Sequence, residues 1–542
     1  MAPGDEPIDI GRNELSGLIE RVEEAIEHEL ALSVEDMKLL LSAISTLCTL
    51  QSQLEQDDIT LSKLRKLLGM IRQSEKRSNT AKKGTSRTGK RGNGHSSKKD
   101  KPKRLPPKTE HHQLQAHQKG DLCPACARGK LYKFEPGKLL RITGHARYEA
   151  TQHIVEQMRC NACWHVEKAP LPESVLEDGD ANQMYGYSAR SLMVLDKFYS
   201  GLPYNHQENL ADIFGFPISA STIYDQCELV ANDAKPLIYE LKRQAAQASG
   251  FLIDDTRNRI LAQKPELRDK RNGRGKQLRS GVYTSGLIAL CDEGQDIILF
   301  ETSLGHAGEH LDCILEKRPA GLPAPQVMSD ALSSNQATKV SVIHCFCNSH
   351  ARRLFFDLEG LYPDELGPIL DAYSQIWENE LVCKQHEFDP MARLAYHQAH
   401  SLPVMQSIKD WGEKKLQADD FEEHSALGKA IRYYLNHFEE LTQFCKLPGA
   451  RIDNNRMEEK LKIPIRGRKT AHFYKTAIGA GVANDLISLI ATALSAKVNV
   501  YDYLCAIQRH KGLVKQRPQD WVPWKFQETL AAIKSEKIDN TS

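Results

Sequence analysis

Short apolar runs that end in acidic residues stand out in the middle of this 542-residue chain. One run begins at Gly250 and ends in Asp254 and Asp255, and another ends at Asp330. Short apolar runs of this kind are typical of buried strands, so we predict a strand at each place with a carboxylate at its end. Further strands are predicted at 281–290, 296–303 and 341–346.

Helices are predicted between these strands, at 308–317 and 347–358. The order β-β-β-α-β-α is that of the ribonuclease H-like fold. In that fold one carboxylate lies on the first strand, a second follows the fourth strand and a third lies on a later helix. Asp254, Asp330 and Glu458 fall at those positions. We therefore predict a multidomain α+β protein with a ribonuclease H-like α/β catalytic core.

Two segments interrupt this core. The stretch 264–281 is strongly basic and is predicted to be a loop between the first two strands. Residues 358–445 carry aromatic and apolar positions at helical spacing and separate Asp330 from Glu458, so we interpret them as a helical insertion. The sequence leaves open whether the insertion holds DNA or a partner subunit. Farther along, Leu486, Ile490 and Leu494 share a helical face that should cover the sheet.

Amides, carboxylates and cations are concentrated in RIDNNRMEEKLKIPIRGRK, at 451–469. If a helix begins near Asn454, residues three and four apart share a face, and Glu458 lies with Asn454, Asn455 and Lys462. An acid framed by amides and cations suits a metal ion that holds phosphate. The alternative is a solvated, salt-bridged helix.

Leucine and isoleucine recur at loosely heptad-like spacing from Leu39 to Ile71, which indicates either a dimerising coiled coil or a helical hairpin. The following segment is dense in lysine and arginine, and between 76 and 108 its one acid is Asp100. Such a segment cannot bury a core, so we expect a disordered linker, a phosphate-binding arm, or both.

Four cysteines form two CxxC pairs, a spacing that suits tetrahedral Zn²⁺ in a structural site. A redox-active dithiol fits this part of the sequence less well, because there are two CxxC pairs and no thioredoxin-like βαβ pattern around them. The predicted zinc ligands are Cys123, Cys126, Cys160 and Cys163.

A helix-turn-helix is predicted around the turn at 214–217. Residues 207–213 form the first helix, and Ser219 or Ser221 can cap the second. The second helix of such a motif enters the major groove. The alternative is that the two helices merely brace the core.

Composition limits the remaining choices. The formal net charge of +1 says nothing about nucleic acid, although the first part of the chain is basic. The 13 cysteines without a regular framework fit a reducing compartment. No signal core begins the chain, and we find no apolar run near the roughly 20 residues of a membrane span. We expect a soluble, intracellular protein.

Several motifs resemble those of IS66-family transposases. They are DDT at 254–256, the acid Asp330, CNSHARRLF at 347–355 and DNNRMEEKLK followed by GRK. The leucine-rich start, basic linker and cysteine pairs occupy matching places. The resemblance covers nearly the whole chain and implies a DDE transposase of the bacterial cytoplasm, associated with the nucleoid.

This resemblance implies roles for particular residues. Asp254, Asp330 and Glu458 would be the catalytic acids and would hold two Mg²⁺ or Mn²⁺ ions, beside a structural Zn²⁺. Expected partners are the terminal inverted repeats of the element, target DNA, further copies of the chain and small accessory proteins. The expected DNA-binding residues are His350, Arg352, Arg353, Asn454, Asn455, Lys462, Arg468 and Lys469.

The chain departs from the family pattern at Asp255, usually Glu, at Glu459, usually Arg, and at Asn348 within the CNSH motif, usually CWAH. Two rival functions are a non-catalytic DNA-binding repressor and a nuclease without strand transfer.

The predicted domains are a helical segment at 1–75, a linker at 76–119, a zinc-binding domain at 120–171, helix-turn-helix-like helices at 184–245, the catalytic domain at 246–505 with its insertion at 358–445, and a tail at 506–542.

Overall fold

A computed structural model describes residues 31–40, 147–159, 166–269, 275–291, 294–418 and 425–539, together with isolated residues at 18, 21, 22, 25, 28, 119–121 and 130. The chain divides into two units, Met1–Gly137 and Lys138–Ser542. In the first unit, residues 34–40 are helical, as the leucine pattern predicts. Most of that pattern, nearly all of the basic linker and the four CxxC cysteines lie outside the described residues.

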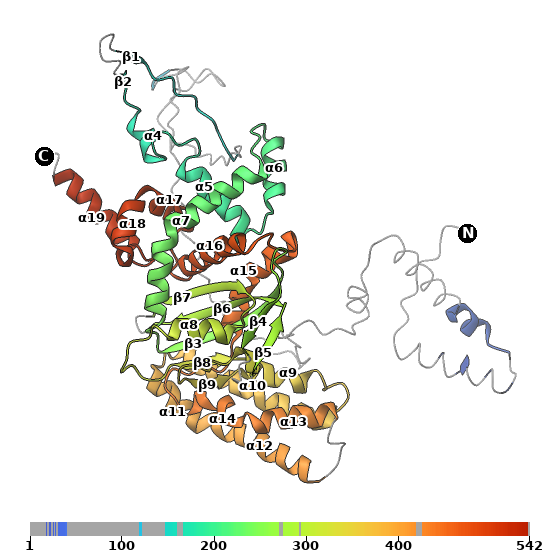
Figure 1. The fold of residues 1–542 in the computed structure, drawn as a ribbon. Helices are drawn as coiled ribbons and strands as arrows, with labels where there is room; N and C mark the ends of the chain where they lie inside the picture. The colour runs from blue at the N-terminus through green and yellow to red at the C-terminus, as the bar shows by residue number, and fades with distance from the viewer. Residues whose placement is uncertain are drawn as a thin grey trace. The chain divides into compact units, whose positions relative to one another are not determined.

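A five-stranded mixed sheet forms the centre of the second unit, in the order β7-β6-β3-β8-β9 (Figure 1). Strand β3 pairs antiparallel with β6, and β6 pairs antiparallel with β7. On its other side β3 pairs parallel with β8, which pairs parallel with β9. The predicted strands are confirmed as β3 Gly250–Asn258, β6 Val282–Leu290, β7 Asp296–Ser303, β8 Gln326–Ser329 and β9 Ile343–Phe346.

Helices cover this sheet. Their apolar side chains and those of the central strands form one continuous core. The predicted helices after β7 and β9 are confirmed, and the helix predicted from about residue 454 begins at 455. The sheet-covering helices are α7 Ala220–Ala245, α8 Ala307–Leu315, α15 Asn455–Ala471 and α16 Ala477–Ser495. Helix α9 Asn348–Phe356 packs instead against the insertion, in whose core Ala351 and Phe355 are buried.

Helix α16 satisfies the backbone of the edge strand β7 with two hydroxyl groups. Ser488 Oγ accepts a hydrogen bond from the Phe300 N–H at 2.8 Å. Thr492 Oγ1 accepts from the Ile298 N–H and donates to the Ile298 carbonyl oxygen, both at 3.0 Å. Three backbone groups on the outer side of this edge strand are thereby satisfied without a further strand.

The expectation that no segment approaches a membrane span is wrong for α16. By length and composition this helix could cross a membrane, with a mean hydropathy of 1.6. However, 67% of the apolar stretch is buried within the protein, because the helix is enclosed by the sheet and by α7. It is therefore the core helix of the second unit.

The predicted helical insertion is confirmed and has an apolar core of its own. Tyr373, Phe355 and Tyr434 are buried there and contact one another edge-on or tilted. The insertion thus packs as a body rather than as helices spread over the sheet (Figure 1). Its helices are α10 Pro363–Gln385, α11 Pro390–His400, α12 Leu402–Gln417, α13 Ala426–Asn436 and α14 Phe438–Leu441.

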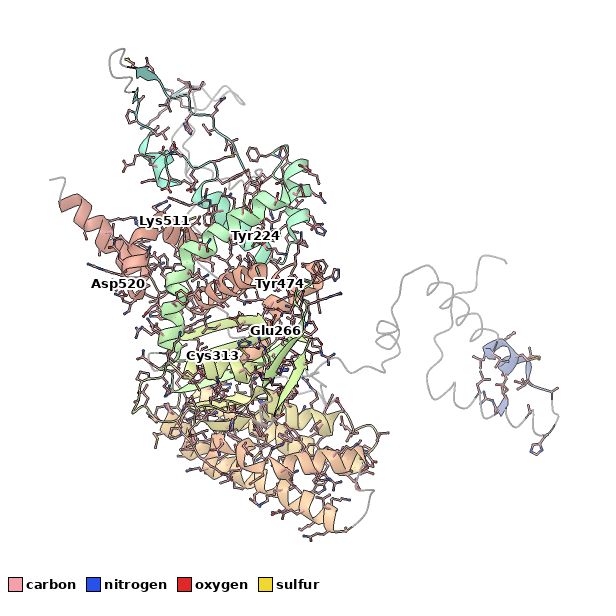
Figure 2. The ribbon with its side chains drawn as sticks, in the orientation of Figure 1. Tyr224, Glu266, Cys313, Tyr474, Lys511 and Asp520 are labelled. Atoms are coloured by element: carbon pink, nitrogen blue, oxygen red, sulfur yellow. The ribbon has the colours of Figure 1, made fainter. Side chains whose placement is uncertain are left out.

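The predicted helix–turn–helix segment forms α6 Tyr204–Ile213 and α7, and Ser219 caps α7 by accepting from the Thr222 N–H. Helix α7 is 26 residues long, and its apolar face packs on α5 Tyr187–Val194 and α16. Figure 2 shows Tyr224 on its first turns. Those turns carry Asp225 and Glu228 and no lysine or arginine, which disfavours entry into the major groove. The arrangement favours the alternative interpretation, that these helices brace the core.

The basic stretch predicted as a loop contains a two-stranded ribbon, so that prediction is wrong in part. Strand β4 Glu266–Asp269 pairs antiparallel with β5 Lys276–Arg279. The other described elements are β1 Gln157–Arg159 and β2 Val166–Lys168, which pair antiparallel, then α4 Glu173–Glu177, η1 Leu195–Tyr199, α17 Val500–Arg509, α18 Lys511–Gln516 and α19 Phe526–Asp539.

Candidate active site

Asp254 lies on β3, directly opposite Gly286 of β6. A Cβ atom at Gly286 would collide with the terminal methyl group of Met457, which belongs to α15. The glycine therefore lets α15 pack closely on the two strands beside Asp254. Met457 and Leu461, which are four residues apart on α15, are both buried here.

Asp330 lies beside Asp254 because of the parallel register of their strands. Leu252 of β3 aligns with Met328 of β8, and each acid follows two residues later on its own chain segment. The Asn335 amide donates to Asp330 Oδ1 at 2.8 Å and fixes the carboxylate just beyond the strand. Two carboxylates thus lie side by side, Asp254 in the middle of β3 and Asp330 just after the end of β8.

Glu458 comes from the first turn of α15, and the start of that helix is tied to β3. Asn454 Nδ2 donates to the Ile253 carbonyl oxygen at 2.8 Å, one residue before Asp254. Nε2 of His350, on α9, lies 3.7 Å from Glu458 Oε1. The three predicted acids are therefore gathered from a strand, a strand end and a helix.

The charges in this group affect one another. The pKa of Asp254 is raised from 3.8 to about 7. Burial is the largest cause, a hydrogen bond from the Asp255 backbone opposes it, and the negative charges of Asp330, Asp255 and Glu458 add to the rise. Burial also raises the pKa of Asp330. A cation beside these groups would relieve the mutual repulsion, since an opposite charge favours the ionised form.

The donor set fits a hard divalent cation. Mg²⁺ prefers carboxylate oxygens, and Glu458 Oε1 is buried without a hydrogen-bond partner among the described residues. The three acids do not form a group whose ligand oxygens all lie within 4.8 Å. They are therefore not spaced to enclose a single ion together.

One group in the described part of the chain does meet that spacing: Glu380, Cys383 and His397 in the insertion. His397 Nε2 lies 3.0 Å from Glu380 Oε2 and 3.9 Å from the Cys383 sulfur. Arg393 Nε donates to the same carboxylate at 2.8 Å, and its Nη1 donates to the Ala450 carbonyl oxygen at 2.7 Å. Because Glu380 is already paired with a buried cation, we interpret this group as an ion-pair network that ties α10 to α11.

The residues predicted to bind DNA divide into exposed and enclosed ones. Lys462 and Lys469 on α15 are exposed, as is Arg353 on α9. Asn455 is also exposed, and its amide donates to Asp453 at 3.0 Å. His350 and Arg352 are partly buried, and the Arg352 guanidinium lies over the Phe356 ring.

Two predicted DNA contacts have structural partners instead. Asn454 is fully buried and joins α15 to β3, so a direct DNA contact by Asn454 is not supported. Arg468 Nη1 donates to Thr256 Oγ1 at 2.9 Å and to the Arg257 carbonyl oxygen, and thereby holds the end of β3. The prediction overlooked that amides and guanidinium groups also bond to neighbouring backbone.

Several important residues were not singled out from the sequence. Nδ1 of His306 lies 2.7 Å from Asp255 Oδ2, next to the first acid. Asn348 is fully buried and donates through Nδ2 to the carbonyl oxygens of Leu441 and Ile452. These hydrogen bonds join residues that are 51 to 104 positions apart, so the sequence around each residue does not indicate its partner. The one local indication is that His306 follows the end of a predicted strand.

Together these features define a class: an α+β protein with three carboxylates gathered around the central strand of a mixed five-stranded sheet. The family model described as "Transposase IS66 family" matches residues 182–481, more than half of the chain. The chain therefore belongs to the IS66 transposase family, as the motifs predict.

Two relatives come from Sinorhizobium fredii, and both are described as uncharacterized proteins. The chain is 24% identical to y4hP over 417 residues, which is 71% of this chain and 70% of y4hP. It is 32% identical to y4jD over 167 residues, which is 30% of this chain and 31% of y4jD. These likenesses place the chain among similar proteins and assign no residue a role.

Proposed function

We propose that the protein is a DDE transposase that cuts the ends of its own element and joins them to target DNA. The observation that carries this proposal is the convergence of Asp254, Asp330 and Glu458 from three distant parts of the chain. The sheet order, with β3 in the centre and the acids gathered around it, supports a ribonuclease H-like core.

In this proposal Asp254 would be shared by two Mg²⁺ or Mn²⁺ ions, and Asp330 and Glu458 would each complete the ligands of one. When bound, the ions would supply activation of the attacking oxygen and stabilisation of the leaving oxygen.

The surrounding residues would place the DNA. Asn454 sets the position of Glu458 through its bond to β3. His350 lies within reach of Glu458, so it can hold a phosphate oxygen beside the same acid. Exposed Arg353, Lys462 and Lys469 supply cations for the backbone phosphates on either side.

The test uses DNA that carries the terminal inverted repeats flanking the coding region. We expect Asp254→Asn to abolish cleavage, by about 10³-fold or more, while binding is retained, because the substitution removes a charge and keeps the shape. The matched control is Asp357→Asn, since Asp357 carries an exposed carboxylate at the end of α9.

Cleavage and joining are both scored. Unchanged cleavage by Asp254→Asn would contradict the proposal. Cleavage without joining would identify a nuclease, and binding without cleavage by the unaltered protein would identify a repressor.

We further propose a structural zinc site formed by Cys123, Cys126, Cys160 and Cys163. The purified full chain should contain about one zinc ion, and replacing Cys123 and Cys126 by serine should remove it. Retention of zinc by that variant would contradict this site. Cytoplasmic location, assembly with further copies and cooperation with accessory proteins belong to the same proposal.

A further inference from the structure

A cavity of about 550 Å³ lies next to the candidate active site. Its walls come from β5, the start of β6, the segment after β7 and the loop after Asp330. Two of these walls adjoin the acids in the chain, since His306 bonds to Asp255, the residue after Asp254, and Ser333 follows Asp330 by three residues. A molecule in the cavity would therefore lie near these acids.

The cavity has an aromatic wall. The rings of Tyr283 and His306 contact each other with centroids 4.1 Å apart and planes tilted by 38°. His306 cannot swing away freely, because Nδ1 is bonded to Asp255 at 2.7 Å. Rings held in place in this way offer a stacking surface for a flat ligand, and every nucleobase has such a face.

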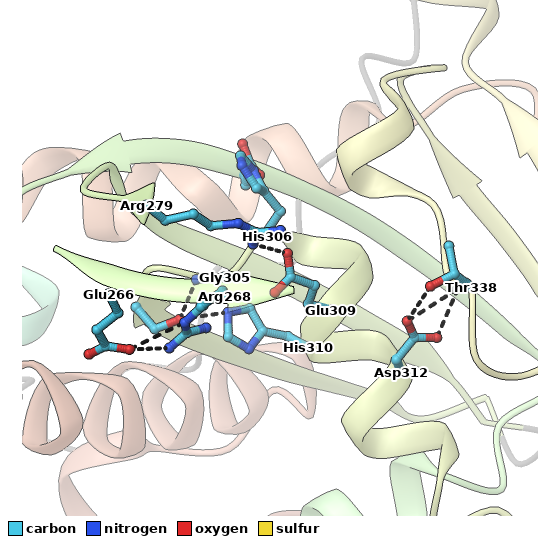
Figure 3. Close-up of polar contacts among 11 residues, drawn as sticks. Glu266, Arg268, Arg279, Gly305, His306, Glu309, His310, Asp312 and Thr338 are labelled. Carbon is cyan, nitrogen blue, oxygen red and sulfur yellow. Dashed lines mark hydrogen bonds and ion pairs between the residues drawn. The ribbon is translucent and has the colours of Figure 1, made fainter. Parts of the chain in front are cut away.

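A neutralised cation also lines the cavity. The Arg279 side chain is only 10% exposed and is ion-paired with Glu309, as Figure 3 shows. Because the carboxylate already balances the charge of Arg279, this wall suits a neutral ligand such as a nucleobase better than a phosphate.

An apolar ridge stands at the lip of the cavity. Leu267 of β4 and Leu278 of β5 are directly paired across the ribbon. They are 69% and 67% exposed, and Leu278 also lines the cavity. Exposed apolar side chains next to bound DNA can enter between base pairs and unstack them.

We propose that the cavity receives one nucleobase, turned out of the DNA beside the phosphate held by the acids, while Leu267 and Leu278 fill the space it leaves in the stack. This inference rests on the proposed function, because it requires DNA at the acids. A base turned out in this way would fix the position of the strand relative to the cleavage point.

The experiment measures permanganate oxidation, which modifies unstacked thymines, on inverted-repeat DNA. Thymine is placed in turn at each position around the cleavage point, and the Asp254→Asn protein is used so that the DNA remains intact. We expect one position to become at least about tenfold more reactive on binding. No reactive position would overturn the inference.

Variants then connect the reactive base to the cavity. In the Asp254→Asn background, Leu267→Ala with Leu278→Ala should lose the hyper-reactive thymine, and Tyr283→Leu should weaken it. In the protein with Asp254 intact, the same changes should slow cleavage of fully paired DNA about tenfold or more. The double leucine variant should regain normal cleavage on DNA that has an abasic site at the reactive position, because no base then needs to be turned out.

The matched controls are Leu361→Ala, a leucine that is 73% exposed in the segment before α10, and Tyr239→Leu, a tyrosine that is 59% exposed on α7. Unfolding curves of all variants show whether the ribbon has kept its fold. If the unaltered protein does not cut the DNA, the proposed function fails. If it cuts normally and the cavity variants match their controls, only this inference fails.

Discussion

Asn454 shows how a single buried amide controls the geometry of the site. It is fully buried at the start of α15, and its amide bonds to the carbonyl oxygen of Ile253. Its backbone N–H donates to the Cys347 sulfur at 3.2 Å, so the same residue also contacts the start of α9. The position of Glu458 depends on this one side chain.

We predict that Asn454→Ala lowers the free energy of unfolding by about 1–3 kcal/mol, because the Ile253 carbonyl oxygen is left buried without its partner. The neighbouring Asn455→Ala is the control, since Asn455 is exposed and its amide bonds only to Asp453. Chemical denaturation of both variants measures the difference. Equal stability would show that the Asn454 bond contributes nothing.

For single residues, the sequence indicates which side chains are candidates for the site and does not indicate which residues they contact. The three acids could be selected because each ends an apolar run or lies in a charged helical motif. The role of Asn454 could not be predicted from the sequence. An amide beside an acid is equally consistent with a DNA contact and with a hydrogen bond that joins a helix to a strand. His306 was missed because its partner Asp255 lies 51 residues earlier.

Among the elements, α16 and β7 depend on each other most directly. The two hydroxyls of the helix replace the neighbouring strand that β7 lacks. We predict that Thr492→Val, which keeps the shape and removes the hydroxyl, destabilises the protein by about 1–3 kcal/mol through the unpaired Ile298 N–H. Thermal unfolding measures it.

The control for this change is Ser407→Ala, which removes an exposed hydroxyl from α12. Its effect should stay within about 0.5 kcal/mol. A Thr492→Val protein as stable as this control would show that the edge of β7 is not satisfied by the helix.

Elements were predictable where burial imposes a pattern. The central strands are apolar runs because both faces of the sheet are covered. The β4–β5 ribbon was not predicted because its described residues are largely exposed on both faces, so its sequence shows no alternation of apolar and polar residues. No length was predicted for the second helix of the helix-turn-helix, although the predicted range 184–245 ends where α7 ends.

Two buried ionisable groups make the stability of the whole second unit depend on pH. Burial lowers the pKa of His310 to about 4, from 6.5. Although burial opposes it, the hydrogen bond from His397 and the charges of Arg393 and Lys384 lower the pKa of Glu380 to about 2, from 4.5. Both pKa values are lower in the folded state, so the unfolded chain binds protons first as the pH falls.

We therefore predict that His310 contributes stability above pH 6.5 that is lost as the pH falls to 4, by at most about 3 kcal/mol, and that Glu380 contributes stability above pH 4.5 that is lost as the pH falls to 2. Asp254, whose pKa is raised in the folded state, acts in the opposite direction, so the effect of His310 is measured as the difference between variant and unaltered protein. His310→Gln should remove the loss that His310 causes as the pH falls to 4, whereas His386→Gln, an exposed histidine, should not. Denaturant titrations at several pH values test this, and an unchanged slope for His310→Gln would contradict it.

The insertion has a consequence for protein synthesis. On the proposed assignment, two acids lie on the sheet and the third follows a separately packed helical body, at position 458. A ribosome therefore completes two acids long before the last one emerges. A chain released early, or cut within the insertion, would carry an incomplete acid set and leave the host chromosome uncut.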